Sequence, residues 1–263
     1  MKKVIALLIA LILTLSVAAI AEGTTVFKMG IDPEFPPYSY LDDNGDYAGY
    51  DVEMAQAVCD LLGWDLEIVE LDWDSKYIML NAGDMDCIWS GLTIDFINPE
   101  EFSVSFPYQE NTQIVLTKAD SGIETLADLE GKVVGVQLGT SADILISEGG
   151  DCEELGATFA DIVRPSSYPL AKTELDANGV DALVIDLSIA SNLIGDNADA
   201  YKILDEAVYT ENYGICFRKD DAEMCAQVEE AFMTLVENGT YLELAQKYES
   251  EGLPLSQLCL TAE

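Results

Sequence analysis

Hydrophobic and polar residues follow one another in patterns that predict an α/β fold. Thr25 to Ile31 alternates between apolar and polar positions, as a strand does, and Trp64 to Leu71 repeats this alternation. Between them, Tyr50 to Leu62 carries apolar residues at helical spacing, with Asp51 placed to cap its start and Gly63 to end it. The order strand, helix, strand predicts an α/β unit with a parallel component.

The first unit leads to an apolar strand at Cys87 to Trp89. A hairpin turn at Asp42 to Asp46 precedes the first helix, and a second helix is predicted at Asp74 to Asn81. After the apolar strand come the small polar residues Ser90 to Thr93, so we expect the strand to end there. Such an edge leaves backbone N–H groups and hydroxyls free, at the place where open α/β sheets bind ligands.

The rest of the chain repeats this pattern and predicts a second ligand-binding edge. The apolar strand Gln113 to Lys118 leaves the first unit, the small polar loop Gln137 to Ser141 follows another predicted strand, and the strand Ala182 to Ile185 ends in Asp186. The other predicted elements are strands at Val133–Val136, Thr158–Val163 and Tyr213–Arg218, and helices at Leu126–Leu129, from Ala142, and at Tyr168–Ala177, Ala222–Glu237 and Tyr241–Tyr248.

Composition changes this picture by excluding partners. Hydrophobic residues make up 49% of the 263 residues, which predicts a globular protein with a real core. The net charge is −37, and the chain has no basic stripe that would hold nucleic acid or an anionic membrane surface. The acidity fits a solvated surface that keeps an exported protein soluble, and it also fits adaptation to high salt, which screens self-repulsion.

The first 21 residues have the pattern of a cleavable signal peptide. Lys2 and Lys3 precede an apolar run from Val4 to Leu15, and Ala19 to Ala21 has the small-x-small form of a cleavage site. Its removal leaves 10 bases against 49 acids, a net charge of −39. No cysteine follows the apolar run, so we expect an exported protein without a lipid anchor, either periplasmic or extracellular.

Histidine is absent, and this restricts the possible chemistry. Ser-His-Asp and Cys-His catalysis are excluded, together with the commonest transition-metal ligand. Six cysteines are present, but their spacing contains no CxxC pair and does not select a disulfide pairing. We therefore expect no metal, no cofactor and no enzymatic activity.

Several motifs, in order along nearly the whole mature chain, resemble the family 3 extracellular solute-binding proteins of polar amino-acid ABC transporters. The motifs are PEFPPYSY, GDYAGYDVEMAQAV, GDMDCIWSGLTI with SFPY, GKVVGVQLGTSAD, GVDALVID, YGICFRKDD and VENGTYLELAQKY. The resemblance implies a two-lobe, periplasmic-binding-protein-like (type II) fold, in which two α/β lobes are joined by two crossing strands with the ligand cleft between them. Lobe 1 would comprise residues 24–112 and 213–263, and lobe 2 residues 113–212.

The resemblance also implies a site for an amino acid, which needs partners for both its ammonium and its carboxylate. For the ammonium it places an acid at Asp186, and the Ser90 carbonyl and Thr93 hydroxyl would complete the shell. Asp32 is a further acid that could meet a cation, although it also fits a loop cap. Asp186 likewise fits a turn residue at the end of a strand.

For the carboxylate, the backbone N–H groups of Gly91 and Thr93 are the candidates in lobe 1. In lobe 2 the loop that contains Leu138, Thr140 and Ser141 precedes a helix, which makes it a possible anion nest as well as an ordinary helix cap. Phe35 and Trp73 are expected to form the pocket wall, with Tyr38 beside them or in the core.

One departure from the family limits the ligand that can be inferred. Family members normally have an arginine eight residues after the position of Ser90, where it clamps the carboxylate, and this chain has Asn98. The surrounding FINPEEF contains no base, and the only arginines, Arg164 and Arg218, do not match the clamp. Either backbone donors suffice for an amino acid, or the ligand is a less anionic amine.

The resulting hypothesis is the binding component of an ABC transporter. A monomer would capture a small polar amino acid or amine-bearing solute by lobe closure and deliver it to a membrane permease. Two alternatives remain: an enzyme of the same fold, similar to cyclohexadienyl dehydratase and using acids such as Asp32 and Asp186, and a sensor that docks on a receptor.

Overall fold

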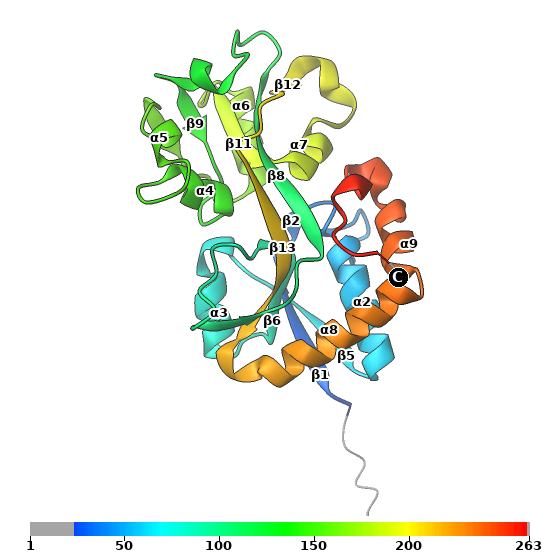
Figure 1. The fold of residues 1–263 in the computed structure, drawn as a ribbon. Helices are drawn as coiled ribbons and strands as arrows, with labels where there is room; N and C mark the ends of the chain where they lie inside the picture. The colour runs from blue at the N-terminus through cyan, green and yellow to red at the C-terminus, as the bar shows by residue number, and fades with distance from the viewer. Residues whose placement is uncertain (1–23, 262–263) are drawn as a thin grey trace, which may run out of the picture.

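The computed structural model describes residues 24–261, so the predicted signal peptide at 1–21 lies outside the described residues. None of the helices in this described part combines the length and apolar character that crossing a membrane requires. The chain forms two lobes, which are visible one above the other in Figure 1. The predicted two-lobe α/β fold is confirmed.

Strands β8 (Gln109–Lys118) and β13 (Tyr209–Arg218) run through both lobes and hold them together. They pair antiparallel at the centre of one ten-stranded sheet of the described chain. The main order of this sheet is β10 (Asp161–Val163), β9 (Val133–Gly135), β11 (Ala182–Asp186), β8, β13, β6 (Cys87–Thr93), β1 (Val26–Ile31) and β5 (Asp65–Glu70). Strands β8 and β13 include both predicted crossings, near Asn111 and near Glu211, which are partners in register. The two lobes are therefore joined by this crossing pair.

Lobe 1 has α/β architecture with the parallel component that the sequence predicts. Strand β1 (Val26–Ile31) pairs parallel with both β5 (Asp65–Glu70) and β6 (Cys87–Thr93). A separate small sheet contains β2 (Glu34–Phe35), β3 (Ser39–Leu41) and β4 (Tyr47–Ala48), and β7 (Phe102–Val104) pairs with β13. The helices are α2 (Tyr50–Leu62), α3 (Lys76–Ala82), which follows the 3-10 turn η1 (Trp73–Ser75), α8 (Ala222–Glu237) and α9 (Thr240–Lys247).

Lobe 2 is built from the middle of the chain. Strand β11 pairs antiparallel with β8 and parallel with β9, which in turn pairs parallel with β10. The strands are β9 (Val133–Gly135), β10 (Asp161–Val163), β11 (Ala182–Asp186) and β12 (Tyr201–Ile203), and the helices are α4 (Ser141–Ile146), α5 (Glu153–Gly156), α6 (Tyr168–Asp176) and α7 (Leu187–Ile194).

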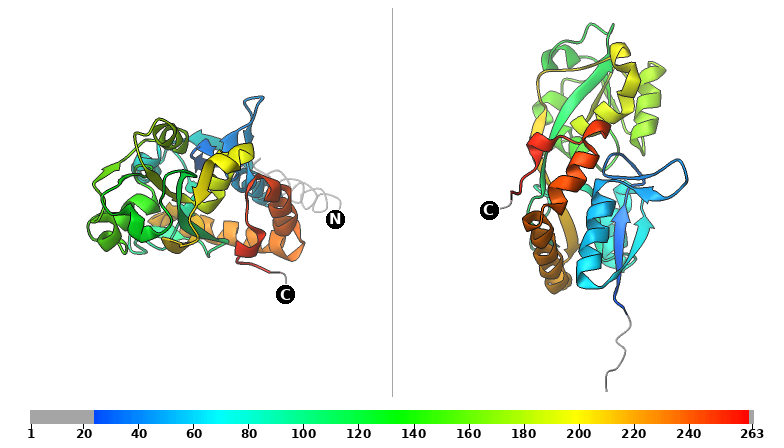
Figure 2. Two further views of the ribbon diagram at one scale, coloured as in Figure 1. Left: turned by 90° about the horizontal axis from the view of Figure 1, so that it is seen from above. Right: turned by 90° about the vertical axis from the view of Figure 1, so that its right-hand side faces the viewer.

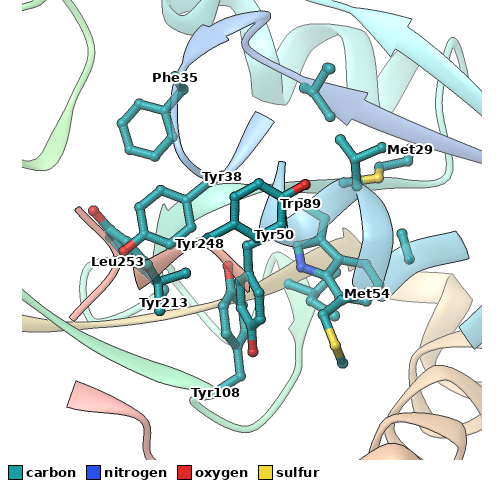
Figure 3. Close-up of a cluster of buried hydrophobic side chains, with 14 of the residues drawn as sticks. Met29, Phe35, Tyr38, Tyr50, Met54, Trp89, Tyr108, Tyr213, Tyr248 and Leu253 are labelled. Atoms are coloured by element: carbon teal, nitrogen blue, oxygen red, sulfur yellow. The ribbon is translucent and has the colours of Figure 1, made fainter. Parts of the chain in front are cut away.

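The C-terminal helices complete lobe 1, although they come last in the chain. Helices α8 and α9 pack against α2, and both figures of the ribbon show these distant segments side by side (Figures 1 and 2). The core between them is rich in aromatic rings, among which Tyr50, Trp89 and Tyr108 are completely buried or nearly so (Figure 3). Burial of such large rings removes much apolar surface from water and so stabilises this half.

Two local predictions in lobe 1 are wrong. Strand β6 does not end after Trp89 but continues to Thr93, because its last residues still pair with β13. The register of this pairing shifts near Gly91, which adopts a φ of 51°. Asp51 does not cap helix α2, which already begins at Tyr50. Its carboxylate is instead fully buried and accepts the Gly91 N–H at 2.7 Å and the Tyr108 hydroxyl at 2.9 Å.

All six cysteines lie in the described residues, and none of them forms a disulfide. Cys59, Cys87, Cys216 and Cys225 are buried, where burial raises the thiol pKa. They pack as small apolar side chains in lobe 1.

Candidate ligand-binding cleft

A cavity of about 240 Å³ lies between the two lobes and is lined by residues of both. Its size is below the range of roughly 300–1,000 Å³ that is usual for drug-sized ligands, so it suits a small solute. Nine of the eleven predicted site residues line it: Asp32, Phe35, Trp73, Gly91, Thr93, Asn98, Thr140, Ser141 and Asp186.

Ser90 and Leu138 do not line the cavity, contrary to the sequence prediction. Ser90 is fully buried behind it, where its hydroxyl accepts the Asp32 N–H at 3.1 Å and bonds the Ser39 hydroxyl at 2.6 Å. Leu138 is 36% exposed and lies outside the cavity lining. Ser90 therefore positions the loop that carries Asp32.

Asp186 ends strand β11 and is 3% exposed. Its carboxylate accepts the side-chain amides of Asn111 at 2.6 Å and Gln113 at 2.9 Å, both from β8, and the hydroxyls of Tyr168 and Tyr213. Burial raises the pKa of Asp186, although the two tyrosine hydrogen bonds oppose this. An acid thus faces the cavity, as predicted.

Glu211 is a second acid at this site, and sequence reasoning missed it. It lies on β13, is 1% exposed, and its Oε1 accepts hydrogen bonds from Thr93, Asn111, Gln113 and Ser141, each at 2.9 Å. Burial, and next the neighbouring charge of Asp186, raise the pKa of Glu211 to about 7. Its Oε2 is buried without a partner in the described protein.

Three predicted carboxylate-binding residues already form hydrogen bonds within the protein. The Gly91 N–H donates to Asp51 in this conformation and is therefore not free for a ligand. Asn98 lines the cavity, but its side chain donates to Glu101 at 3.0 Å and accepts the Glu100 N–H at 3.1 Å. In lobe 2, Thr140 caps α4 by accepting the Asp143 N–H at 3.3 Å.

Lys76 is the one base among the described residues that line the cavity. It begins α3, is 5% exposed, and its ammonium donates to the carbonyls of Trp73 at 3.0 Å and Gly139 at 2.7 Å. Burial lowers the pKa of Lys76 to about 8. A signal existed in the sequence, because Lys76 stands four residues before the buried Leu80 and so shares the core-facing side of the helix.

Aromatic rings form one wall of the cavity, as predicted. The Phe35 ring stacks on Trp73 with centroids 6.5 Å apart and an interplanar angle of 10°, and it lies 5.7 Å from Tyr168 of lobe 2. Tyr38 is fully buried behind Phe35, with ring centroids 5.4 Å apart, and so belongs to the core (Figure 3). The wall offers ring faces for apolar groups or cations.

Further contacts join the lobes in front of the crossing strands. Gln137 of lobe 2 donates to Asp32 of lobe 1 at 3.1 Å, and burial raises the pKa of Asp32. Gly139, with a φ of 74°, approaches lobe 1 so closely that an added Cβ would lie 2.9 Å from Asp74 Cα. The described conformation is therefore one in which the lobes touch around the cavity.

Comparison with known proteins places this architecture in a family. The model of the bacterial extracellular solute-binding proteins, family 3, matches residues 27–251. The chain belongs to this family. A probable histidine-binding protein of Neisseria gonorrhoeae is 31% identical to this family 3 protein, over 88% of the chain and 85% of the relative.

Solved structures of binding proteins agree with the fold. An ABC uptake transporter substrate-binding protein of Streptococcus pneumoniae with bound histidine superimposes with a TM-score of 0.81 at 28% identity, covering 87% of this chain and 94% of the other. An ancestral amino acid-binding protein, described as a precursor of cyclohexadienyl dehydratase, gives a TM-score of 0.76 at 28% identity, covering 85% and 95%. The family 3 protein thus shares its architecture with proteins that bind amino acids.

Proposed function

We propose that this protein captures a small polar amino acid or amine-bearing solute between its lobes and delivers it to the membrane permease of an ABC transporter. The observation that carries the proposal is the acid pair Asp186 and Glu211 beside a small interlobe cavity with an aromatic wall. A buried acid pair favours a cationic group, because an ammonium offsets the cost of keeping the carboxylates ionised in a low-dielectric site. The names of the relatives, which bind histidine and other amino acids, support the same ligand class.

Capture would use closure of the lobes about the crossing strands. The ligand would add contacts to those that already join the lobes, and so shift the population towards the closed state. We propose that the lobes divide at residues 112/113 and 212/213, within the crossing strands. We also propose that the protein works outside the cytoplasm, since the family comprises extracellular solute-binding proteins.

Mass spectrometry of small molecules released from the purified protein tests this function directly. We expect an amino acid or amine to be released on denaturation, and the same compound to bind the refolded protein in calorimetry. The variant Asp186→Asn should bind it about 100-fold more weakly, since it loses a charge-assisted partner of the ammonium. Failure of every amino acid and amine to bind would contradict the proposal.

The matched proteins do not favour the alternative of a dehydratase, because the relatives and the ancestral neighbour are named as binding proteins. Incubation with arogenate or prephenate and detection of the aromatic product would reveal such an activity. A receptor-docking sensor would bind the same solutes, so neighbouring genes for a permease and an ATPase would distinguish the transporter role.

A further inference from the structure

Lys76 is the group in the cleft to which the proposed function gives no task. Burying an ammonium is costly unless it is paired and hydrogen-bonded, yet in the described part of the chain Lys76 forms no ion pair with a carboxylate. Its hydrogen bonds to the Trp73 and Gly139 carbonyls use two of its three donors. A positive charge and one donor are therefore left at the wall of the cavity.

We propose that Lys76 supplies the positive charge that receives the ligand's carboxylate, in place of an arginine at position 98. The inference rests on the proposed function and narrows its ligand to an amino acid with a free carboxylate. The segment around Asn98 contains no base, and the structure supplies one from another part of lobe 1. The missing charge comes from helix α3 and not from the segment that contains Asn98.

The two arginines are committed elsewhere, so they do not compete for this role. Arg164 pairs with Asp143 at 2.7 Å, and Arg218 pairs with Asp86 at 3.0 Å and with Asp221 at 2.6 Å. Neither lines the cavity. Lys76 is thus the cation to which a carboxylate bound there has access among the described residues.

Charge is separated along the wall of the cavity in a way that fits a zwitterion. The Tyr168 hydroxyl bonds Asp186, the Tyr168 ring lies 5.7 Å from Phe35, and Phe35 stacks on Trp73. The Lys76 ammonium lies 4.6 Å from the centroid of the Trp73 ring. A row of three rings therefore connects the acidic end at Asp186 with the basic end at Lys76, and the ligand's ammonium and carboxylate would point to opposite ends.

The contact between Lys76 and Gly139 gives the same residue a place in closure. Lys76 belongs to lobe 1 and the Gly139 carbonyl to lobe 2, so this hydrogen bond forms only when the lobes meet. The Gly139 carbonyl therefore positions the Lys76 ammonium when the lobes are closed, and the ligand's carboxylate would bind the ammonium in this position. Ligand binding and closure would favour each other through one ammonium.

The charge on Lys76 should make binding depend on pH near 8, which is where burial places its pKa. The groups that face it are Asp74 from η1, Cys216 from β13 and Tyr77 from its own helix. Burial raises the pKa of the Cys216 thiol to about 12 and that of the Tyr77 phenol above its usual value, so neither changes charge between pH 7 and 9. Loss of the Lys76 proton would remove the partner of the carboxylate.

The test compares amino acids with their decarboxylation products, because each pair differs only in the carboxylate. The twenty standard L-amino acids and the corresponding amines, such as histidine with histamine and arginine with agmatine, are screened by thermal shift and the binders measured by calorimetry. We expect the native protein to prefer the amino acid of the best pair, and Lys76→Met to weaken amino acid binding about 10- to 100-fold more than it weakens binding of the amine, which loses only the interlobe hydrogen bond to Gly139. Lys76→Arg should retain the preference, and Lys132→Met, which removes a charge outside the cavity lining, should change nothing.

Proton uptake provides a second readout. At pH 8.5 the calorimetric enthalpy of amino acid binding should differ between phosphate and Tris buffers, because Lys76 takes up a proton as the carboxylate binds, and the difference should be smaller in Lys76→Met, where only the ligand's own ammonium can take one up. Equal binding of amino acid and amine, or equal amino acid binding by Lys76→Met and the native protein, would overturn the role of Lys76 and leave the solute-binding function intact. Binding of neither class would overturn both.

Discussion

Asn111 and Glu211 face each other across the two crossing strands, and the Asn111 side chain donates to Glu211 Oε1 at 2.9 Å. The same oxygen accepts the hydroxyls of Thr93 from lobe 1 and Ser141 from lobe 2, each at 2.9 Å. One buried carboxylate thus connects the hinge with both lobes. Asp186 accepts hydrogen bonds from the same side-chain amides, those of Asn111 and Gln113, so the two acids lie close together. Their combined negative charge therefore acts on a ligand bound in the cleft.

Glu211 should make the affinity for ammonium ligands fall as the pH is lowered from 8 to 6. Its pKa is raised to about 7, so the carboxylate that favours a cation is ionised above this value and becomes protonated below it. We expect binding at pH 6 to be about 10-fold weaker than at pH 8. Calorimetry across this range with an amine ligand, whose charge is constant and which has no carboxylate to meet Lys76, measures the effect.

Glu211→Gln should bind more weakly at pH 8 and lose most of the pH dependence. Glu110→Gln, which changes an exposed acid on the neighbouring strand, is the control and should behave as the native protein does. A native affinity that does not change between pH 6 and 8 would show that Glu211 does not contribute to binding.

Asp51 should make the fold less stable as the pH rises. Burial raises its pKa from 3.8 to about 7, so the stabilisation from its protonated form is present below pH 4 and lost as the pH rises through 7. Asp51→Asn has no such titration. Relative to the variant, the native protein should lose on the order of 3 kcal/mol of unfolding free energy between pH 5 and pH 8.

Urea unfolding of both proteins at the two pH values measures this difference, since all other titrations are common to them. The variant's own penalty for changed hydrogen bonds at Gly91 and Tyr108 does not depend on pH and cancels. Stability curves that run parallel between pH 5 and 8 would contradict the assignment of this titration to Asp51.

Gly139→Ala should weaken ligand binding by opening the contact between the lobes. The added methyl group would lie 2.9 Å from Asp74 Cα, a distance that backbone atoms in the closed state cannot tolerate. Gly122→Ala is a matched control, because Gly122 has nearly the same φ, 75°, with open space around its Cβ position. Both variants carry the backbone penalty of about 1 kcal/mol for a left-handed residue, but only Gly139→Ala adds a clash.

We expect Gly139→Ala to bind about 10-fold more weakly than Gly122→Ala in calorimetry, and to have a larger radius of gyration with saturating ligand in small-angle X-ray scattering. Equal affinities of the two variants would indicate that closure does not bring Gly139 against Asp74.

Asn98→Arg should increase the affinity for amino acids about 10-fold, if position 98 still reaches the carboxylate. A guanidinium would add a bidentate, charge-assisted pair, whereas Asn98 now bonds Glu101 and Glu100. Asn98→Gln is the neutral control. In a Lys76→Met background the arginine should restore lost binding, and unchanged or weaker binding by a folded variant would show that position 98 does not meet the carboxylate.

Most helices and strands were predictable because their signals are local. Helix α2 and helix α8 have the predicted bounds, since apolar periodicity and terminal residues determine both. Strand β6 was predicted too short, because its continuation to Thr93 depends on pairing with β13, more than a hundred residues later. Helix α7 was not predicted, since Asp186 was interpreted only as the end of a strand.

The site was predictable where residues carry a motif and not where they act through tertiary position. Asp186, Thr93 and Phe35 line the cavity as expected. Lys76 and Glu211 were missed because a single lysine in a helix, or a glutamate in a polar strand, is typical of a solvent-facing side chain. Tertiary packing buries both, and the one local signal was the helical spacing between Lys76 and Leu80.

The pairing of β6 with a strand from the end of the chain also determines the order in which the two lobes can fold during synthesis. Strand β10 pairs with β9, β9 with β11 and β11 with β8, and all four precede β13 in the chain. Strand β6, in contrast, pairs with β13, which comes late in the chain. During synthesis, which starts at the N-terminus, the edge of β6 therefore stays unpaired until β13 is made, whereas the lobe 2 strands β9, β10 and β11 already have their partners. Lobe 2 can mature during synthesis, and the half of the protein that begins first is finished last.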